Sequence, residues 1–470
     1  MAPKPNKGVI VIEQSKVSPP PGSVPTTTLP LSFLDVPWLL FPHMQRPYFF
    51  EYPHSTHHFL QTLLPSLKSS LSLTLQHFFP FAANLVRPPP PAKLHILFTD
   101  GDSVSLTVAE SAADFHYLSA PHPLPVRALD PFIPKLSGPT PVERGGDALA
   151  EPVLALQITV FPNSGICIGV RFSHVVADGR AFHHFFKSWA LLCKTGGDLT
   201  QLNRELRLPS HDRAAVKDQY GLELEFLETW RSLAPTWSKV DEGVALRNVR
   251  AAFALSQSQI VGLKRWLTNQ LAKDDDFTSF HMSSFVVICS VIWICLAKSE
   301  ERNSTAIDIK NDEPYHFAFV ADCRKRLQFP LPITYFGNCL TVCFASVNWK
   351  ELVGENGFVA AAKAIGKEVG EMNREALKEL ENWIMRFKKI KELGLQHVTV
   401  VGSPKFGIYE TDFGLGRPVK TEPIHFNDSN TIALYESCND KGGVGVSLAL
   451  SRVRMSRFST ILEEILKELA

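Results

Sequence analysis

The run His174-Val175-Val176-Ala177-Asp178-Gly179 lies between two segments of different character. Ile166 to Phe172 is apolar and predicts a buried strand, whereas Ala181 to Leu192 repeats apolar side chains at the spacing of a helix. A histidine at such a strand-to-helix junction can lie at the mouth of a cleft. Because imidazole titrates near neutral pH, it is suited to take a proton from a hydroxyl. Since so short a motif also occurs by chance, the function of His174 depends on a second signature.

The second signature is the run Tyr409-Glu410-Thr411-Asp412-Phe413-Gly414-Leu415-Gly416-Arg417-Pro418. Its glycines and final proline predict a loop. Together the two runs resemble the two hallmark motifs of the plant BAHD acyltransferases, His-x-x-x-Asp-Gly and Asp-Phe-Gly-Trp-Gly, and their separation of more than 200 residues also fits that family. One departure is visible, because Leu415 stands where the family usually has tryptophan. This change removes an aromatic ring and an indole donor.

Three further runs extend the resemblance over nearly the whole chain. Leu29-Pro30-Leu31-Ser32-Phe33-Leu34-Asp35 is similar to the opening strand of the family. Asp322-Cys323-Arg324-Lys325-Arg326-Leu327 resembles the end of its central strand. Tyr335-Phe336-Gly337-Asn338-Cys339 is similar to the motif of the branch that acylates anthocyanins and other phenolic glycosides.

The resemblance implies a mixed α/β (α+β) fold of two domains related to chloramphenicol acetyltransferase, with a solvent channel between them. Residues 1–200 would form the N-terminal domain with the His-x-x-x-Asp motif. Residues 201–247, which are polar and irregular, are the candidate crossover linker. Residues 248–470 would form the C-terminal domain with the Asp-Phe-Gly-Leu-Gly motif.

Hydrophobic periodicity predicts elements in both halves. The turn Pro162-Asn163-Ser164-Gly165 predicts a hairpin between strands at 153–161 and 166–172. The first 25 or so residues are expected to be disordered. Further strands are expected at 94–98, 104–108, 249–255, 317–321, 340–347, 398–401, 432–437 and 444–450, and helices at 55–77, 222–233, 259–271, 283–297, 358–389 and 458–469.

Composition excludes several classes of protein. The chain has 470 residues, of which 45% are hydrophobic and 20% charged, with a formal net charge of +1. This balance is ordinary for a globular protein and provides no basic field for nucleic acid. The longest apolar stretch, Phe285 to Ala297, is too short to span a bilayer, and the N-terminus lacks the apolar region of a secretory signal. We therefore expect a cytosolic monomer that binds neither membrane nor nucleic acid.

Neither the cysteines nor the histidines predict a metal site. The eight cysteines form no Cys-x-x-Cys pair, and most lie in apolar runs, as buried free thiols do in a reducing compartment. His183 and His184 follow His174 by nine and ten residues, so the three do not share one helical face easily. No carboxylate or cysteine completes a ligand set.

The resemblance gives His174 the role of general base, which deprotonates a substrate hydroxyl that attacks a thioester carbonyl. No covalent intermediate is then needed, and no serine or cysteine lies in a Gly-x-Ser-x-Gly elbow. Asp178, at i+4, could orient the imidazole, but the resemblance implies that it points away and pairs with an arginine. Arg324, at a strand end, is the candidate partner. Gly179 is expected to relieve a tight backbone.

The Asp-Phe-Gly triplet at 412–414 also matches the magnesium motif of protein kinases. That interpretation fails because the glycine loop, the His-Arg-Asp loop and the Ala-Pro-Glu motif of kinases are missing from the sequence. In BAHD enzymes this loop lies away from the histidine and shapes the CoA side. Asp412 is therefore expected to be structural rather than catalytic, together with the loop glycines Gly414 and Gly416.

The resemblance to the branch that acylates phenolic glycosides implies transfer of a malonyl group from malonyl-CoA to a sugar hydroxyl of an anthocyanin or flavonoid glucoside, because many members of that branch use malonyl-CoA. The acyl-CoA is a co-substrate, and no permanently bound cofactor is expected. Arg180 is the candidate cation for the malonyl carboxylate, with a surface role as the alternative. A hydroxycinnamoyl-CoA donor is the second possibility. A family member that has lost catalysis and serves in binding or regulation is a third.

Overall fold

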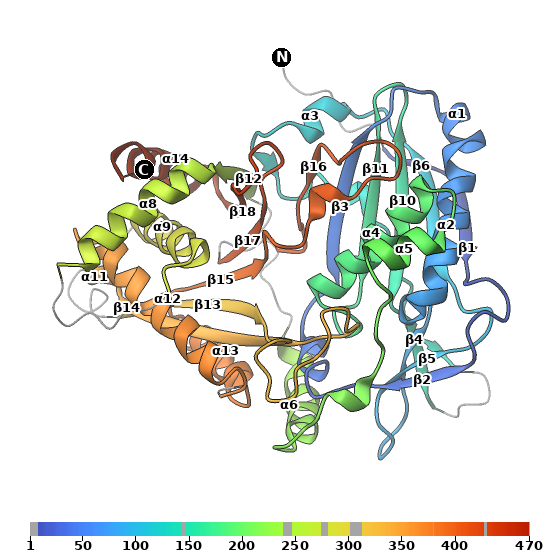
Figure 1. The fold of residues 1–470 in the computed structure, drawn as a ribbon, viewed down its shortest axis with the longest axis horizontal. Helices are drawn as coiled ribbons and strands as arrows, with labels where there is room; N and C mark the ends of the chain where they lie inside the picture. The colour runs from blue at the N-terminus through green and yellow to red at the C-terminus, as the bar shows by residue number, and fades with distance from the viewer. Residues whose placement is uncertain are drawn as a thin grey trace.

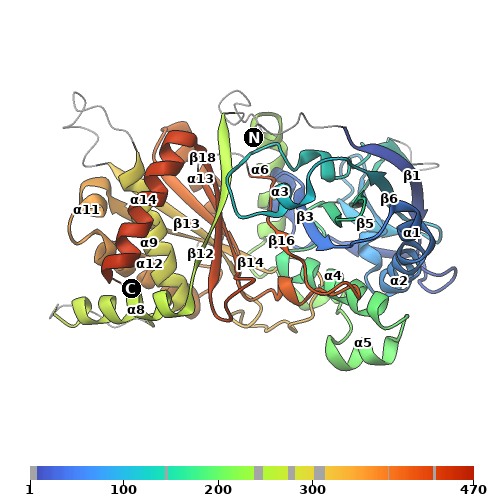
Figure 2. The ribbon, with the colours of Figure 1, turned by 90° about the horizontal axis from the view of Figure 1, so that it is seen from above.

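The computed structural model describes residues 8–142, 147–237, 247–273, 281–300, 313–378, 380–426 and 430–469. Two lobes lie side by side in both views, one built mainly from the first half of the chain and one mainly from the second (Figures 1 and 2). Each lobe mixes helices and strands, so the predicted mixed α/β class is confirmed. Where the structure is described, no helix is both long and apolar enough to cross a bilayer.

The N-terminal lobe contains two sheets. Within the described residues, the larger has the order β1-β6-β10-β11-β3-β16 and the smaller the order β2-β5-β4-β9-β8. The strands contributed by the first half of the chain are β1 (Ile10–Val17), β2 (Thr27–Pro30), β3 (Met44–Glu51), β4 (Asn84–Arg87), β5 (His95–Phe98), β6 (Val104–Glu110), β7 (Leu124–Pro125), β8 (Thr140–Pro141), β9 (Leu149–Pro152), β10 (Leu154–Phe161) and β11 (Gly165–Phe172).

The C-terminal lobe has one sheet, with the order β14-β13-β15-β17-β18-β12-β7 among the described residues. The strands from the second half of the chain are β12 (Asn248–Leu255), β13 (Pro314–Asp322), β14 (Leu340–Asn348), β15 (His397–Gly402), β16 (Lys420–Thr421), β17 (Thr431–Glu436) and β18 (Val444–Ser451).

Each lobe lends a two-residue strand to the sheet of the other. β7, from the first half of the chain, pairs antiparallel with β12, so that Leu124 faces Arg250. β16, from the second half, pairs antiparallel with β3, so that Thr421 faces Tyr48. The two sheets are therefore completed across the predicted linker at residues 201–247, and the division into two domains there stays a prediction.

Helices cover the sheets and connect the lobes. α4 lies against the N-terminal sheet in Figure 1 and packs on α2, while α9 packs against α12 and α14 in the C-terminal lobe. The helices are α1 (Thr56–Gln61), α2 (Leu63–His77), α3 (Phe115–Ser119), α4 (Gly179–Lys194), α5 (Leu199–Glu205), α6 (Leu222–Trp237), α8 (Gln257–Leu271), α9 (Ser284–Ser299), α11 (Trp349–Val353), α12 (Gly357–Arg374), α13 (Trp383–Glu392) and α14 (Arg452–Leu469), with short 3-10 turns at Val36–Leu40, Phe79–Phe81, Asp130–Phe132, Arg213–Ala215 and Ile408–Glu410.

Most predicted elements are present, and the differences have local causes. The helix expected at 55–77 is divided at Thr62, and the one expected at 358–389 is divided into α12 and α13. The prediction of disorder over the first 25 residues is wrong for residues 10–17, which form strand β1 and pair with β6, whereas residues 1–7 lie outside the described residues. The strand expected at 29–35 ends at Pro30, after which the chain turns into a 3-10 helix. Part of the predicted linker, residues 238–246, lies outside the described residues.

Candidate active site

His174 lies in the loop that connects the hairpin of β10 and β11 to α4. All eight residues of β10 and most of β11 are buried, which fixes the end of β11 at Phe172. Asp178 then caps α4, since its Oδ1 accepts the backbone N–H of Ala181 at 3.0 Å. An aspartate cap of this kind ends the loop and begins the helix at a defined residue. His174 is half-buried in the loop between the two elements.

The ring of His174 is held by a residue of the C-terminal lobe. His174 Nδ1 lies 3.1 Å from Asn338 Oδ1. The amide nitrogen of Asn338 donates to Asp35 Oδ1 at 2.9 Å and to the carbonyl of His174 at 2.9 Å, so the amide oxygen must face the imidazole. An oxygen there only accepts, which places the ring proton on Nδ1. The lone pair of Nε2 is then the one available to take a proton.

Asp35 anchors this arrangement from within the core. Its side chain is fully buried and accepts from Ser32 Oγ at 2.6 Å, from Asn338 and from Arg213 Nη1 at 2.6 Å. Arg213 also donates to the hydroxyl of Tyr335 at 3.1 Å. A buried carboxylate with these donors is fully paired, and it fixes the orientation of the Asn338 amide.

Trp38 covers one face of His174. The two rings stack with centroids 4.0 Å apart and planes 9° from parallel. Burial lowers the pKa of His174 below its ordinary value of 6.5. Hydrogen bonds and the negative charges of Asp178 and Asp35 raise this pKa, but by less than burial lowers it. A histidine with a lowered pKa is neutral near pH 7 and is ready to act as a base.

Asp178 pairs with Arg324, as the sequence suggested. Arg324 Nη1 lies 2.8 Å from Asp178 Oδ2, and both side chains are buried. Asp178 Oδ2 also accepts the backbone N–H of Cys339 at 3.1 Å, and Arg324 donates to the carbonyls of Tyr335 and Gly337, each at 3.1 Å. The pair thus fixes the segment that presents Asn338 to His174. This geometry gives Asp178 a structural position.

Gly179 follows directly at the start of α4. A Cβ placed on it would lie 2.9 Å from the ring of Phe406. The predicted need for glycine at this position therefore has a steric basis, which is the close approach of an aromatic ring to the backbone.

Arg180, the candidate cation for a malonyl carboxylate, already has a carboxylate partner. Its Nε lies 2.5 Å from Asp322 Oδ2, and Asp322 Oδ1 lies 3.2 Å from Arg324. Arg180 therefore extends the ion-pair network of Asp178. A donor-binding role would require Arg180 to exchange Asp322 for the substrate, and it stays a prediction.

The Asp-Phe-Gly-Leu-Gly loop lies at the other end of α4. Asp412 Oδ1 accepts the N–H groups of Gly414 and Gly416, each at 2.8 Å, and Oδ2 pairs with Lys194 at 2.8 Å. Both glycines have positive φ, 91° and 80°, which this tight turn requires. Because α4 rises about 1.5 Å per residue over 16 residues, its ends are roughly 24 Å apart. Asp412 is thus placed for loop structure rather than for chemistry at His174.

Three residues around His174 escaped the sequence analysis as site residues: Asp35, Trp38 and Asn338. Asp35 and Asn338 belong to runs that carried the family resemblance, so a signal existed, but the sequence does not show that the two runs meet. Trp38 has no local signal, because a tryptophan beside prolines and leucines is typical of a core.

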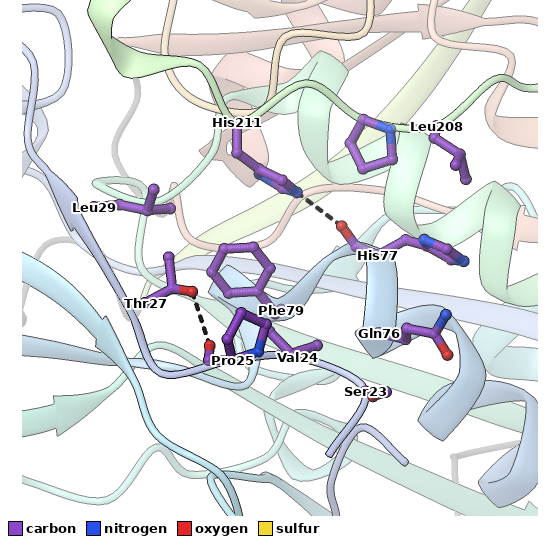
Figure 3. A pocket seen from close by; sticks show the side chains of 11 residues that line it. Ser23, Val24, Pro25, Thr27, Leu29, Gln76, His77, Phe79, Leu208 and His211 are labelled. Atoms are coloured by element: carbon purple, nitrogen blue, oxygen red, sulfur yellow. Dashed lines mark hydrogen bonds between the residues drawn. The ribbon is translucent and has the colours of Figure 1, made fainter. Parts of the chain in front are cut away.

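A cavity of about 400 Å³ opens elsewhere, between the end of α2, β2 and residues 208–211 (Figure 3). In it, His211 Nε2 donates to the carbonyl of His77 at 2.8 Å. His174 does not line this cavity. Among the described residues there is no group of three or more His, Cys, Asp or Glu side chains that could hold a metal.

Comparisons with known proteins identify the family of the chain. A family model described as the transferase family matches residues 9–465. Coumaroyl-CoA:anthocyanidin 3-O-glucoside-6''-O-coumaroyltransferase 1 of Arabidopsis thaliana is 38% identical over 98% of both chains. Malonyl-coenzyme A:anthocyanin 3-O-glucoside-6''-O-malonyltransferase of Dahlia pinnata is 35% identical over 97% of this chain and 96% of its own. Phenolic glucoside malonyltransferase 1 of Nicotiana tabacum is 36% identical over 90% and 91%.

Solved structures support the fold. Vinorine synthase superposes with a TM-score of 0.68 at 20% identity, covering 97% of this chain and 98% of its own. F. sporotrichioides TRI101 complexed with coenzyme A and T-2 gives a TM-score of 0.64 at 17% identity, covering 91% and 96%. The chain belongs to the BAHD acyltransferase family, and it is an acyltransferase.

Proposed function

We propose that this acyltransferase moves an acyl group from an acyl-CoA to a sugar hydroxyl of an anthocyanin or related phenolic glucoside. The observation that supports the proposal best is the His174–Asn338 contact, in which the lone pair of His174 Nε2 remains available to accept a proton. The substrates follow from relatives named for acylation of anthocyanin or phenolic glucosides, at 35–38% identity over nearly the whole chain.

The reaction would proceed by direct attack. The sugar hydroxyl loses its proton to His174 Nε2 while its oxygen bonds to the thioester carbonyl carbon. The tetrahedral oxyanion then collapses, the carbon–sulfur bond breaks, and the CoA thiolate takes the proton from His174. The products are the O-acyl glucoside and free CoA, and the imidazole returns to its starting state.

For the donor, we propose an aromatic acyl group of the hydroxycinnamoyl class, such as coumaroyl. An aromatic cluster begins at the ring that stacks on His174: Trp38 lies 6.0 Å from Trp383, and Phe41 lies 5.7 Å from Trp383 and 5.9 Å from Trp237. Trp38 and Trp383 are themselves buried, and aromatic rings of this kind would hold an aryl ligand through offset and edge-to-face contacts. The two coumaroyltransferases of Arabidopsis thaliana, each 38% identical, support the same donor.

Malonyl-CoA, which the sequence analysis ranked first, is the second candidate. It is favoured by the relatives named as malonyltransferases and by the place of Arg180 directly after the motif. Malonyl-CoA ranks below the aromatic donor because Arg180 already pairs with Asp322. A malonyl carboxylate buried in the site would need a cation that is available to pair with it. Arg180→Leu separates the two roles: if Arg180 binds the donor, malonyl-CoA use falls about tenfold or more relative to acetyl-CoA use.

The test is an assay of purified protein with coumaroyl-CoA and malonyl-CoA against an anthocyanidin 3-O-glucoside, with mass spectrometry of the product. His174→Ala is the control, and it should lower kcat by about 10²- to 10⁴-fold without a change in fold. A preference for malonyl-CoA would refute the aromatic donor. Absence of CoA release with every donor would favour a family member that binds substrates without catalysis.

A further inference from the structure

Residues 422–426, which follow β16, are fixed firmly between the two lobes. The N–H of Ile424 donates to the carbonyl of Gln45 on β3 at 3.0 Å. From the other side, the buried guanidinium of Arg250 on β12 donates to the carbonyls of Pro423 at 3.2 Å, Ile424 at 3.3 Å and Phe426 at 2.5 Å. The side chains of this short segment therefore have defined positions.

His425 in this segment has a defined tautomer. The backbone N–H of Gln45 points at His425 Nδ1 over 3.3 Å, and a backbone N–H can only donate. The carbonyl of Gln45 also lies 3.4 Å from the same nitrogen, but it already has a donor in the N–H of Ile424, whereas a proton on Nδ1 would leave the Gln45 N–H facing another donor. Nδ1 is therefore the acceptor, and the proton of the neutral ring is on Nε2.

The Nε2–H of His425 is buried and has no hydrogen-bond partner among the residues that the structure describes. A buried donor without a partner costs free energy, so its presence in a fixed position calls for a ligand atom that completes it. A single accepting oxygen would satisfy it.

The place of His425 suggests where that oxygen comes from. Gln45, which holds the ring, is the strand partner of Arg171 on β11, three residues before His174. Burial is the largest effect that holds the pKa of His425 well below 6.5. The nearby side chains of His174, Arg46 and Arg250 lower this pKa further. The ring is thus neutral at pH 7, and the nearby guanidinium groups of Arg46 and Arg250 favour an oxygen that carries partial negative charge.

We propose that His425 donates its Nε2–H to a substrate oxygen at the reaction centre, either the carbonyl oxygen of the thioester or an oxygen of the glucoside. Both are hydrogen-bond acceptors, and either would complete the buried donor. This role deepens the function proposed above and rests on it. His425 thereby becomes a substrate-positioning residue supplied by the segment that crosses between the lobes.

Two amide variants separate the proposed bond from the structural one. In His425→Asn, the side-chain oxygen can accept the Gln45 N–H as Nδ1 does, but no donor reaches the place of Nε2. In His425→Gln, the amide nitrogen can occupy that place. We expect kcat/KM to fall about tenfold in His425→Asn, the effect of one net hydrogen bond, with a Tm close to wild type. In His425→Gln, kcat/KM should stay within about threefold of wild type, whereas the Tm should be lower because the Gln45 N–H loses its acceptor.

The kinetic constants identify the oxygen. A loss of kcat with every glucoside assigns the bond to the thioester carbonyl, whereas a rise in the KM of the glucoside alone assigns it to the acceptor. An unchanged His425→Asn, or equal losses in both variants, would overturn the role of His425. A wild-type protein without transfer activity would instead reject the function itself, so the two failures are distinguishable.

Discussion

His174 Nδ1 and Asn338 Oδ1, 3.1 Å apart, join the two lobes at the candidate reaction centre. His174 comes from the loop before α4 and Asn338 from the loop before β14. The Nδ1–H tautomer of His174, the candidate base, therefore depends on a residue from each lobe. The same contact raises the pKa of His174 against the larger effect of burial.

Asn338→Ala should change the pH profile as well as the rate. Loss of the amide acceptor removes a contribution that raises the pKa of His174, so the acidic limb of kcat/KM should move to lower pH. The plateau should fall about tenfold, because the ring proton is no longer fixed on Nδ1. The measurement is kcat/KM from pH 5 to 8. A lower plateau with an unshifted limb would mean that Asn338 acts on the fold and not on the imidazole.

Asp178→Ala should destabilise the protein strongly. It leaves the buried guanidinium of Arg324 without its nearest carboxylate, a loss of about 3–5 kcal/mol in the free energy of unfolding. Asp178→Asn should cost less, because the amide oxygen can still cap α4. Urea denaturation measures both. Lys194→Ala, which breaks the exposed pair with Asp412, is the matched control and should unfold like wild type. Two inactive Asp178 variants of wild-type stability would make the aspartate catalytic.

Stability should fall below pH 6.5 because of buried histidines. Burial lowers the pKa of His211 to about 4, so between pH 6.5 and 4 the unfolded chain binds a proton that the folded protein does not. His211 therefore contributes full stability above pH 6.5, and about 3 kcal/mol of it is lost as the pH falls to 4. The free energy of unfolding of wild type and His211→Gln at pH 7.5 and 4.5 checks this. An equal loss of unfolding free energy in the two proteins would mean that His211 does not cause the pH dependence.

Trp383→Leu should affect an aromatic donor selectively. Trp383 belongs to the aromatic cluster that starts at Trp38 but does not itself stack on His174. Loss of one aromatic contact corresponds to about 0.5–1.5 kcal/mol, or a two- to twelvefold fall in kcat/KM for coumaroyl-CoA. The value for malonyl-CoA should change much less. An equal fall in kcat/KM for both donors would mean that the aromatic cluster supports the hydrophobic core and does not bind the donor.

Local patterns predicted the elements that carry the site. The apolar runs on either side of the turn at Pro162–Gly165 predicted the hairpin, and the helical spacing after Gly179 predicted α4. Strand β1 was missed because it lies at the sheet edge with Ile10 and Val11 exposed, so its backbone pairing, not a buried face, holds it. The two-residue strands β7 and β16 are too short to show any period.

Most of the long-range contacts could not be predicted from the sequence. The pairing of Asp178 with Arg324 could be proposed because both lie in motifs, but nothing in the sequence indicates that Asp322 would meet Arg180. The contact of Asn338 with Asp35 spans 303 positions and depends on the assembled lobes. The solvent channel, the cytosolic location and the monomeric state stay predictions.

The short strand β16 also affects how the protein is made. Without residues 420–421, β3 is an open edge of the N-terminal sheet, and open edges pair with other chains. A nascent chain keeps that edge without its partner until residues 420–421 have left the ribosome. Exchange of whole lobes between family members would likewise separate β3 from the strand that pairs with it, so functional hybrids should need junctions that keep the two together.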